Sequence, residues 1–282
     1  MRLHTETNYD IRILQQKIIG NLKAIDAVCR EHHLRYYLWA GTMLGAVRHR
    51  GFIPWDDDMD ICMPRPDYEQ LLAHWREWLP QPYEIISPET DATYPYPFAK
   101  VEDSSTTVLE RPDFQFLEGV YIDVFPIDGV PSSTLARRWH FGRYHFWRHL
   151  LFLRGRDPFK HGHGPRSWLP WLIHRAFSLD WLQRKVRSFM VRYDYDSSDS
   201  VCDYDDGARG IIAKRVLGTP TPYAFESETF LGVEHYDEYL TTKYGDYMQL
   251  PPKEKQIQHH FFRLDLHRSY KTTTVEEVKS EE

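Results

Sequence analysis

The sequence predicts an α+β domain in which a small mixed sheet is flanked by helices. Two patterns support this class of fold. Apolar residues recur at helical spacing over residues 9–32, whereas residues 58–63 alternate polar and apolar side chains as a β-strand does. Both kinds of pattern recur along the chain, with no internal repeat and no long linker between them. We therefore expect one domain over residues 1–268, followed by a disordered tail over residues 269–282.

The elements of this domain follow from apolar spacing and from the residues that interrupt it. Residues 9–32 form an amphipathic helix because residues such as Leu14 and Ile18 fall on one face. Pro64 ends the strand that begins near Asp58, since proline has no backbone donor. We expect the other elements in this order: a strand over 34–39, a turn at Gly41, a helix over 42–49, a helix over 67–79, strands over 83–86, 97–101, 106–109 and 120–125, helices within 134–192, a polar break over 197–206 and a helix over 237–244.

Charge is distributed unevenly along the chain, whose formal net charge is −6. Residues 132–192 contain 13 Lys and Arg against two Asp, so this basic helical segment carries +11 and the remainder −17. We interpret it as an insertion after a catalytic core over residues 34–129. Its Arg and His residues are interleaved with Trp, Phe and Leu, which is typical of helices on anionic membrane surfaces. We expect peripheral membrane contact through residues 134–192.

Other interpretations of this basic helical segment stay open. It would also suit a helical subdomain packed on the core, or a docking surface for an anionic polymer. Arg interleaved with aromatic residues is also found in proteins that bind single-stranded nucleic acid, but the acidic remainder of the chain speaks against that partner.

Cysteine usage and hydropathy bear on the cellular compartment. The three cysteines are far apart in sequence and form no CxxC pair, which argues against a disulfide scaffold or a zinc knuckle and favours a reducing compartment. The first ten residues contain no apolar core of a signal peptide, and no apolar run approaches the roughly 18 residues of a membrane span. We therefore expect a cytoplasmic protein that works at the inner face of the cell membrane.

An acidic stretch, FIPWDDDMDI over residues 52–61, is the strongest chemical signal. Asp58 and Asp60 are two residues apart in a strand pattern, so their side chains should leave the same face, roughly 7 Å apart at Cα. Two like charges in this geometry repel one another unless a cation lies between them. Hard carboxylate oxygens suit Mg²⁺ or Mn²⁺, with phosphate oxygens completing the coordination shell.

Three other interpretations of the acidic stretch are weaker. A solvated surface run would not be framed by Trp55 and Ile61. A calcium loop starting at Asp56 would need Gly in place of Ile61 and Glu in place of Asp67. A glycosyltransferase with an Asp-x-Asp motif would place a long nucleotide-binding half before it, and here only a helix, a strand and a short turn precede it.

The order of motifs fits a nucleotidyltransferase-like site. Such a site combines a Gly-containing turn and short helix, a strand with an Asp-x-Asp pair, and a third carboxylate from a neighbouring strand. The backbone N–H groups at Gly41 and Thr42, where a helix begins, can bind phosphate oxygens. Asp123 lies alone among apolar residues of a later strand, where a carboxylate is costly unless it is paired or bound to a metal. A strand-edge Asp123 that faces water is the alternative.

Four segments in this order resemble the LicD family, phosphotransferases of the nucleotidyltransferase superfamily related to the fukutin group. They are LWAGTMLGAVRHRGFIPWDDDMDICMPRPDYEQL (38–71), YPFAKVEDSSTTVLE (96–110), YIDVFPIDG (121–129) and YDEYLTTKYGDYMQLPPKEKQIQHH (236–260). The resemblance implies an enzyme that transfers a phospho-alcohol, typically phosphocholine from CDP-choline, to a sugar hydroxyl of a teichoic acid, lipopolysaccharide or capsule. Fukutin-related proteins carry extra cysteines and a membrane anchor that this sequence lacks, which favours the bacterial branch.

The resemblance also assigns roles to residues. The metal-binding aspartates of the family correspond to Asp58 and Asp60, and its later strand carboxylate to Asp123. We expect these three to hold Mg²⁺ or Mn²⁺, with Asp123 also accepting the proton of the attacking hydroxyl. Lys100, which matches a basic position of the family, would complement phosphate charge. Arg48 is a further candidate for this contact, with a surface position as the alternative.

The choline end of the donor calls for aromatic rings, because a quaternary ammonium binds ring faces. Trp39 and Trp55 flank the metal motif and are the candidates. His259 and His260 lie in a family-like segment, where chemistry and packing are both open. The transferred alcohol stays open between choline, ethanolamine, glycerol and ribitol. Other hypotheses are a nucleotidyltransferase or glycosyltransferase with another activated nucleotide donor, and an inactive binding module.

Overall fold

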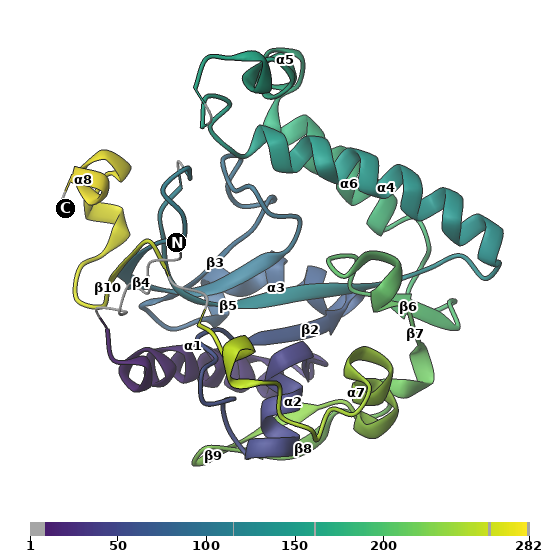
Figure 1. The fold of residues 1–282 in the computed structure, drawn as a ribbon. Helices are drawn as coiled ribbons and strands as arrows, with labels where there is room; N and C mark the ends of the chain where they lie inside the picture. Colours follow the sequence, from purple (N-terminus) through teal and green to yellow (C-terminus); the bar gives the residue numbers. More distant parts are fainter. Residues whose placement is uncertain (1–8, 115, 161, 259–260, 281–282) are drawn as a thin grey trace.

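The structure, a computed structural model, describes residues 9–114, 116–160, 162–258 and 261–280. Its centre is a mixed sheet in the order β10-β4-β5-β2-β1-β9-β8, with β3 paired to β4 and with β6 linking β5 to β7. The pairs β2–β5 and β1–β9 are parallel, and the other pairs are antiparallel. The predicted mixed sheet flanked by helices is therefore confirmed (Figure 1).

The strands are short except for two at the centre of the sheet, and their bounds are β1 Tyr37–Leu38, β2 Asp60–Pro64, β3 Tyr83–Ile86, β4 Ala99–Leu109, β5 Glu118–Gly129, β6 Ser200–Cys202, β7 Ile212–Ala213, β8 Thr221–Phe225, β9 Glu228–Gly232 and β10 Arg263–Asp265. The strands predicted over 97–101 and 106–109 are one strand, β4. The register of β4 on β5 shifts between Asp103 and Val108, and this irregularity explains why the sequence shows two patterns. The polar break predicted over 197–206 contains β6.

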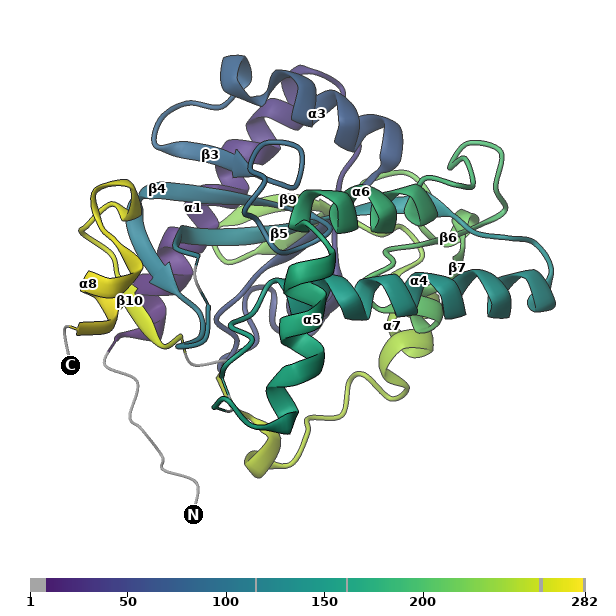
Figure 2. The ribbon, with the colours of Figure 1, turned by 90° about the horizontal axis from the view of Figure 1, so that it is seen from above.

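The helices are α1 Ile11–Glu31, α2 Ala40–His49, α3 Arg65–Trp78, α4 Thr134–Arg154, α5 Trp168–Ala176, α6 Leu179–Met190, α7 Tyr236–Tyr244 and α8 Val275–Ser280. Helix α1 begins where the Asp10 carboxylate accepts a hydrogen bond from the Arg12 backbone N–H, which caps the first turn. Its apolar face packs on β4 and β5, and the Asn21 side-chain amide donates to the Val120 carbonyl at 2.7 Å. Helices α4 and α6 lie on the other side of the sheet (Figures 1 and 2).

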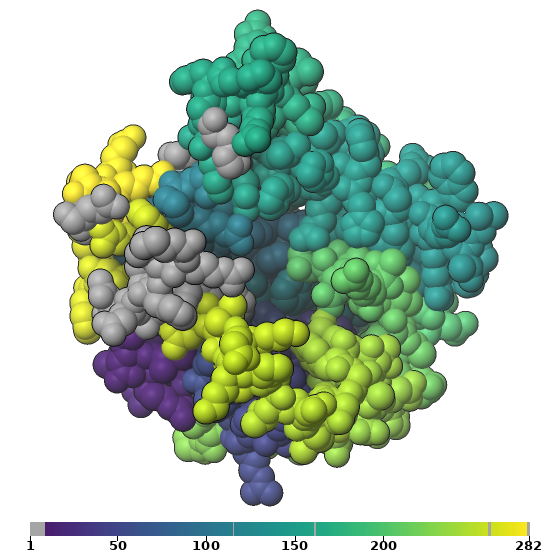
Figure 3. Space-filling model, viewed as in Figure 1, coloured from purple at the N-terminus to yellow at the C-terminus, as the bar shows by residue number. Residues whose placement is uncertain are grey.

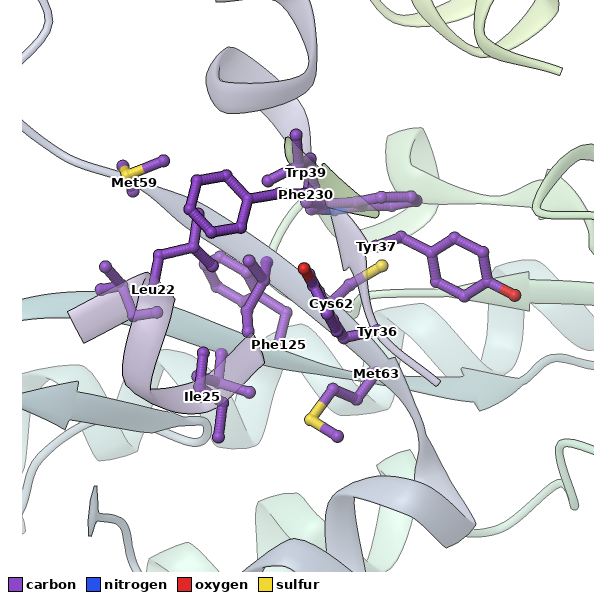
Figure 4. Close-up of a cluster of buried hydrophobic side chains, with 14 of the residues drawn as sticks. Leu22, Ile25, Tyr36, Tyr37, Trp39, Met59, Cys62, Met63, Phe125 and Phe230 are labelled. Carbon is purple, nitrogen blue, oxygen red and sulfur yellow. The ribbon is translucent and has the colours of Figure 1, made fainter. Parts of the chain in front are cut away.

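Buried apolar residues form separate clusters. The largest lies around α1, α2 and the central strands, and Figure 4 shows part of it, with Leu22 and Ile25 on α1 and Cys62 on β2. A second cluster joins α4 and α6 through residues such as Phe141, Tyr144 and Val186. The basic helical segment thus packs around a second apolar core, to which Val130, Cys202 and Tyr204 from outside the segment also contribute.

Residues 269–280 are ordered, so the prediction of a disordered tail is wrong for them. Helix α8 buries Val278 against Leu109 and Phe114, and the Tyr270 hydroxyl donates to Glu102 at 2.6 Å. The sequence did not indicate this order because the segment is mostly polar and only a few apolar contacts hold it in place. Among the described residues, none of the helices has the length and apolar character needed to cross a membrane.

Candidate active site

Three side chains predicted for the site lie side by side on adjacent strands. Asp123 of β5 pairs with Asp60 of β2 on one side and with Lys100 of β4 on the other. Residues in register on neighbouring strands project from the same face of a sheet. The strand order β4-β5-β2 therefore brings together carboxylates that are 63 positions apart in the sequence.

Asp58 belongs to the same acidic group, although it precedes β2 rather than lying within it. Burial, followed by the negative charges of Asp58 and Asp123, holds the pKa of Asp60 well above its usual range. Burial also raises the pKa of Asp123 to about 8, against the opposing charge of Lys100. The Asp123 Oδ1 atom is buried and has no hydrogen-bond partner in the part of the chain that the structure describes. These carboxylates are costly to ionise, which fits a place where a cation would lie.

The start of α2 lies against the same group. The Asp60 backbone N–H donates to the Thr42 hydroxyl at 2.8 Å, so Thr42 fixes the beginning of β2. A Cβ added at Gly41 would lie 3.2 Å from an Asp56 carboxylate oxygen. Asp56 also contributes to the raised pKa of Asp60. The structure thus places the predicted phosphate-binding turn beside the acidic group, and it adds Asp56 to that group.

Lys100 lies in a buried ionic network. Its Nζ atom is 2.9 Å from Glu118 and 3.0 Å from Glu110, and it sits 3.3 Å from the centroid of the Tyr121 ring. Burial alone would lower the pKa of Lys100, but the two carboxylates raise it well above its usual range. The Tyr96 and Tyr121 hydroxyls donate to Glu110. Lys100 is therefore next to Asp123 but already neutralised, and its predicted contact with phosphate stays a prediction.

The other predicted binding residues are placed as follows. Arg48, in the last turn of α2, donates to the Tyr247 carbonyl at 2.8 Å. Trp55 is half-buried and packs on the main core. Trp39 is 1% exposed and stacks on Tyr239, so the proposed role of its ring in a choline site is wrong. His259 and His260 lie outside the described residues. The binding roles of Arg48 and Trp55 stay predictions.

A pocket of about 690 Å³ opens beside Asp123, between the sheet and helix α4. The face in Figure 3 is hollowed between the helical segment and the C-terminal part of the chain. Aromatic and basic side chains line the pocket together, including Tyr96, Phe98, Phe114, Phe125, Arg111, His145, Arg148, His149, Phe152 and Arg156. The sequence showed the basic and aromatic character of α4, but only the tertiary structure shows that α4 forms a wall of the pocket.

Two further residues near the acidic group were missed by the sequence analysis. Lys243 of α7 lowers the pKa of Asp60 and forms an ion pair with Asp206. The pKa of Tyr244 is raised by burial and by the charges of Asp60 and Asp206. Both belong to the segment at 236–260 that resembles the family, so the motif was recognised but its position was not.

Comparisons with known proteins show similarity over most of the chain. Residues 33–160 match the family model described as LicD/FKTN/FKRP, nucleotidyltransferase domain. The chain is 29% identical over 258 residues to the lipopolysaccharide cholinephosphotransferase LicD of Haemophilus influenzae, covering 89% of this chain and 96% of that protein. Uncharacterized proteins of Rickettsia typhi and Rickettsia prowazekii are each 38% identical over 59 and 60 residues, about a fifth of each chain.

The chain is therefore an enzyme that transfers a phosphate-containing group. Residues 33–160 match the nucleotidyltransferase domain of the LicD/FKTN/FKRP model, so the resemblance to the LicD family that the sequence motifs indicated is confirmed.

Proposed function

We propose that this enzyme transfers phosphocholine from CDP-choline to a sugar hydroxyl of a lipopolysaccharide-type glycan. The relative from Haemophilus influenzae is named a lipopolysaccharide cholinephosphotransferase and aligns over nearly its whole length. The observation that carries the proposal is the register of Asp60 and Asp123 on adjacent strands, with Asp58 close to both. A diphosphate donor and a hydroxyl acceptor require such a group of carboxylates beside a pocket.

The acidic group fits a divalent cation. Within the described ranges, the Asp123 Oδ1 atom has no hydrogen-bond partner, and the pKa of Asp60 stays raised although Lys243 lowers it, so the nearby lysines do not fully neutralise this group. Among the described residues, no three His, Cys, Asp or Glu side chains are gathered closely enough to hold a metal by themselves. Mg²⁺ is usually bound by one or two carboxylates together with substrate phosphates, so this arrangement suits it. Asp58, Asp60 and Asp123 would hold the Mg²⁺ or Mn²⁺.

A metal bound there would neutralise charge on the diphosphate of the donor. The chain itself supplies the rest of the chemistry. Asp123 lines the pocket as well as the acidic group, so a sugar hydroxyl that enters the pocket can give its proton to this carboxylate. Thr42 holds the strand that carries Asp60, and the helix start at Gly41 lies within reach of the same phosphates.

The side chains that line the pocket are chemically complementary to a phospho-alcohol and to a nucleotide. The guanidinium groups of Arg111, Arg148 and Arg156 complement phosphate charge. Tyr96 and Phe98, which stack on one another, contribute aromatic rings to the pocket wall, against which a base or a trimethylammonium group would rest. These rings replace Trp39 as the candidates for the choline site. The glycan acceptor would meet the enzyme in the cytoplasm, at the inner face of the membrane.

The test is donor consumption by the purified full chain. The enzyme is incubated with Mg²⁺, a glycan acceptor and one donor at a time: CDP-choline, CDP-ethanolamine, CDP-glycerol, CDP-ribitol, a UDP-sugar or a nucleoside triphosphate. We expect CMP release from CDP-choline above all other donors, and loss of turnover after chelation of the metal. Preferential release of UDP or pyrophosphate would instead establish the glycosyltransferase or nucleotidyltransferase hypothesis.

A further inference from the structure

The helical segment carries most of the large apolar side chains that face solvent. Of the 15 exposed large hydrophobic residues found among the described residues, ten lie between positions 135 and 181. Trp139 on α4 is 70% exposed and Trp168 on α5 is 67% exposed. Scattered exposed apolar residues are ordinary, but a concentration of them in one segment marks an interaction surface.

Helix α4 has two apolar faces. Phe141, Tyr144 and Leu151 are buried in the cluster that it shares with α6. Leu135 and Phe146 lie with Trp139 on the opposite face, within about 40° of one another around the axis, and all three are exposed. One face thus accounts for the packing of α4, and the other has no role in the fold.

Helix α5 continues this surface. It stands out from the body of the molecule (Figures 1 and 2), and Ile173 is its only buried residue. Trp168, Leu169 and Leu172 are each more than half exposed. A nine-residue helix rich in exposed Trp and Leu is amphipathic in a way that suits an interface between water and an apolar phase.

The charge of the basic helical segment indicates which class of partner binds this surface. Residues 132–192 carry +11, whereas the remainder of the chain carries −17. Exposed basic residues such as Arg138, Arg166 and Arg175 accompany the apolar side chains. A second copy of the chain placed on this face would set one positive surface against another. An anionic lipid surface satisfies both the rings and the charges.

We infer that helices α4 and α5 dock on the anionic face of a lipid bilayer, with Trp168 and Trp171 at the level of the head groups. This inference rests on the proposed function, because it supplies the contact with a lipid-linked glycan acceptor. The pocket adjoins the same helix: Phe152 of α4 is 50% exposed and also lines the pocket, as does Arg156 just after α4. Docking therefore places the pocket mouth beside the membrane, where the acceptor sugar lies.

The experiment is flotation of the full chain with vesicles of phosphatidylcholine alone or with about a third phosphatidylglycerol. We expect the protein to float with the anionic vesicles only, and to be released at about 0.5 M salt, because screening shortens the range of surface charges to a few ångströms. Replacement of Arg175 or Arg166 by Gln should lower partitioning about fivefold for each charge removed.

The apolar contribution is tested with a double variant, Trp168→Ser/Trp171→Ser. Its matched control is Ile13→Ser/Ile257→Ser, which removes two similarly exposed apolar side chains outside the helical segment. We expect at least a tenfold loss of anionic-vesicle binding in the first and none in the second, with unchanged melting temperatures. Equal losses in both variants, or equal binding to neutral vesicles, would overturn the inference.

Two further measurements separate this inference from its alternatives. Sedimentation of the wild type should show a species that the double variant does not alter; a dimer that the variant dissociates would make this face a protein interface instead. Phosphocholine transfer to a soluble sugar acceptor without vesicles should be unchanged in the double variant. Absence of transfer in the wild type would contradict the proposed function while leaving vesicle binding intact.

Discussion

The acidic group on the inner strands of the sheet and the basic helical segment each place side chains in unfavourable surroundings. On β2 and β5, burial raises the pKa of Asp60 and Asp123, so that ionisation of these carboxylates is costly. In the helical segment, Trp139 and Trp168 hold apolar surface in water, which is costly as well. Neither cost contributes to the fold. Each would be explained by a partner proposed above: a cation with a diphosphate in one case and a lipid surface in the other.

The difference between the two regions also concerns their packing. The acidic group lies on strands that pair with one another across the main core, so its geometry depends on the whole domain. The helical segment packs around the second apolar cluster. Substitutions in the acidic group or at Lys100 should therefore affect the transfer reaction or the stability of the domain. Substitutions in the helical segment should affect ligand or membrane binding, or the local stability of that segment.

The largest effect is expected for Asp60→Asn. Loss of one carboxylate charge from the acidic group should reduce phosphocholine transfer by at least 10³-fold, equivalent to about 4 kcal/mol in the activation barrier. Stability should not fall, because the substitution removes a buried like charge beside Asp58 and Asp123. The turnover number and the melting temperature are measured together. The exposed Asp196→Asn serves as the control, and near-normal turnover in Asp60→Asn would contradict the assignment.

The next largest effect is on stability and tests the role of Lys100. Lys100→Met leaves Glu110 and Glu118 buried without their positive partner, which should cost about 3–5 kcal/mol of unfolding free energy. Urea unfolding measures this loss. The double variant Lys100→Met/Glu118→Gln should recover part of it, because it removes one of the two unpaired charges.

This double-variant cycle also decides between two functions of Lys100. If Lys100 binds the donor phosphates, transfer should fall in both variants to a similar extent, whatever their stability. If Lys100 only neutralises its carboxylates, activity should recover together with the unfolding free energy. Equal stability of the wild type and Lys100→Met would show that the buried ion pair contributes little.

The two regions also differ in how far the sequence predicted them. The pair Asp58 and Asp60 was predicted from a strand pattern of period two, although Asp58 lies before β2, and Asp123 stood out as a lone acid in an apolar strand. Their meeting depends on the parallel pairing of β2 with β5, for which the family motifs rather than the spacing provided the guide.

The sequence predicted the helical and basic character of this segment, but not its position relative to the acidic group. Its basic and aromatic character was evident, yet nothing local showed that Arg148 and Phe152 line the pocket beside Asp123. Likewise, the network of Lys100 with Glu110 and Glu118 depends on contacts between residues 10 and 18 positions apart, with Glu110 just after β4 and Glu118 on β5. Such contacts are properties of the tertiary fold, and they leave no periodic signal.

A smaller effect, on pH dependence, is expected within the helical segment. Burial, assisted by the charges of Arg192 and Arg143, lowers the pKa of His140 to about 4. Its Nε2 atom is 2.7 Å from the Tyr204 hydroxyl. A histidine with a depressed pKa in the folded state stabilises the protein above its unfolded pKa of about 6.5, and that stability is lost as the pH falls toward 4.

The measurement is urea unfolding at pH 7.5 and at pH 5. The unfolding free energy of the wild type should fall between these values by about 2 kcal/mol more than that of His140→Gln. The exposed His74→Gln on α3 is the control and should keep the pH dependence of the wild type. Parallel pH profiles for the wild type and His140→Gln would show that His140 is not buried as a neutral ring.

The smallest effect connects the two regions, because Arg148 belongs to the helical segment but lines the pocket beside Asp123. Arg148→Ala should raise KM for the donor about tenfold, the loss of one charge-assisted contact, with little change in kcat. Arg184→Ala on α6 is the control, since its ion pair with Asp180 is exposed and outside the pocket. A fall in kcat with unchanged KM would instead place Arg148 at the reacting phosphate. The helical segment would then take part in the transfer reaction itself, and the division between a catalytic acidic group and a binding helical segment would no longer hold.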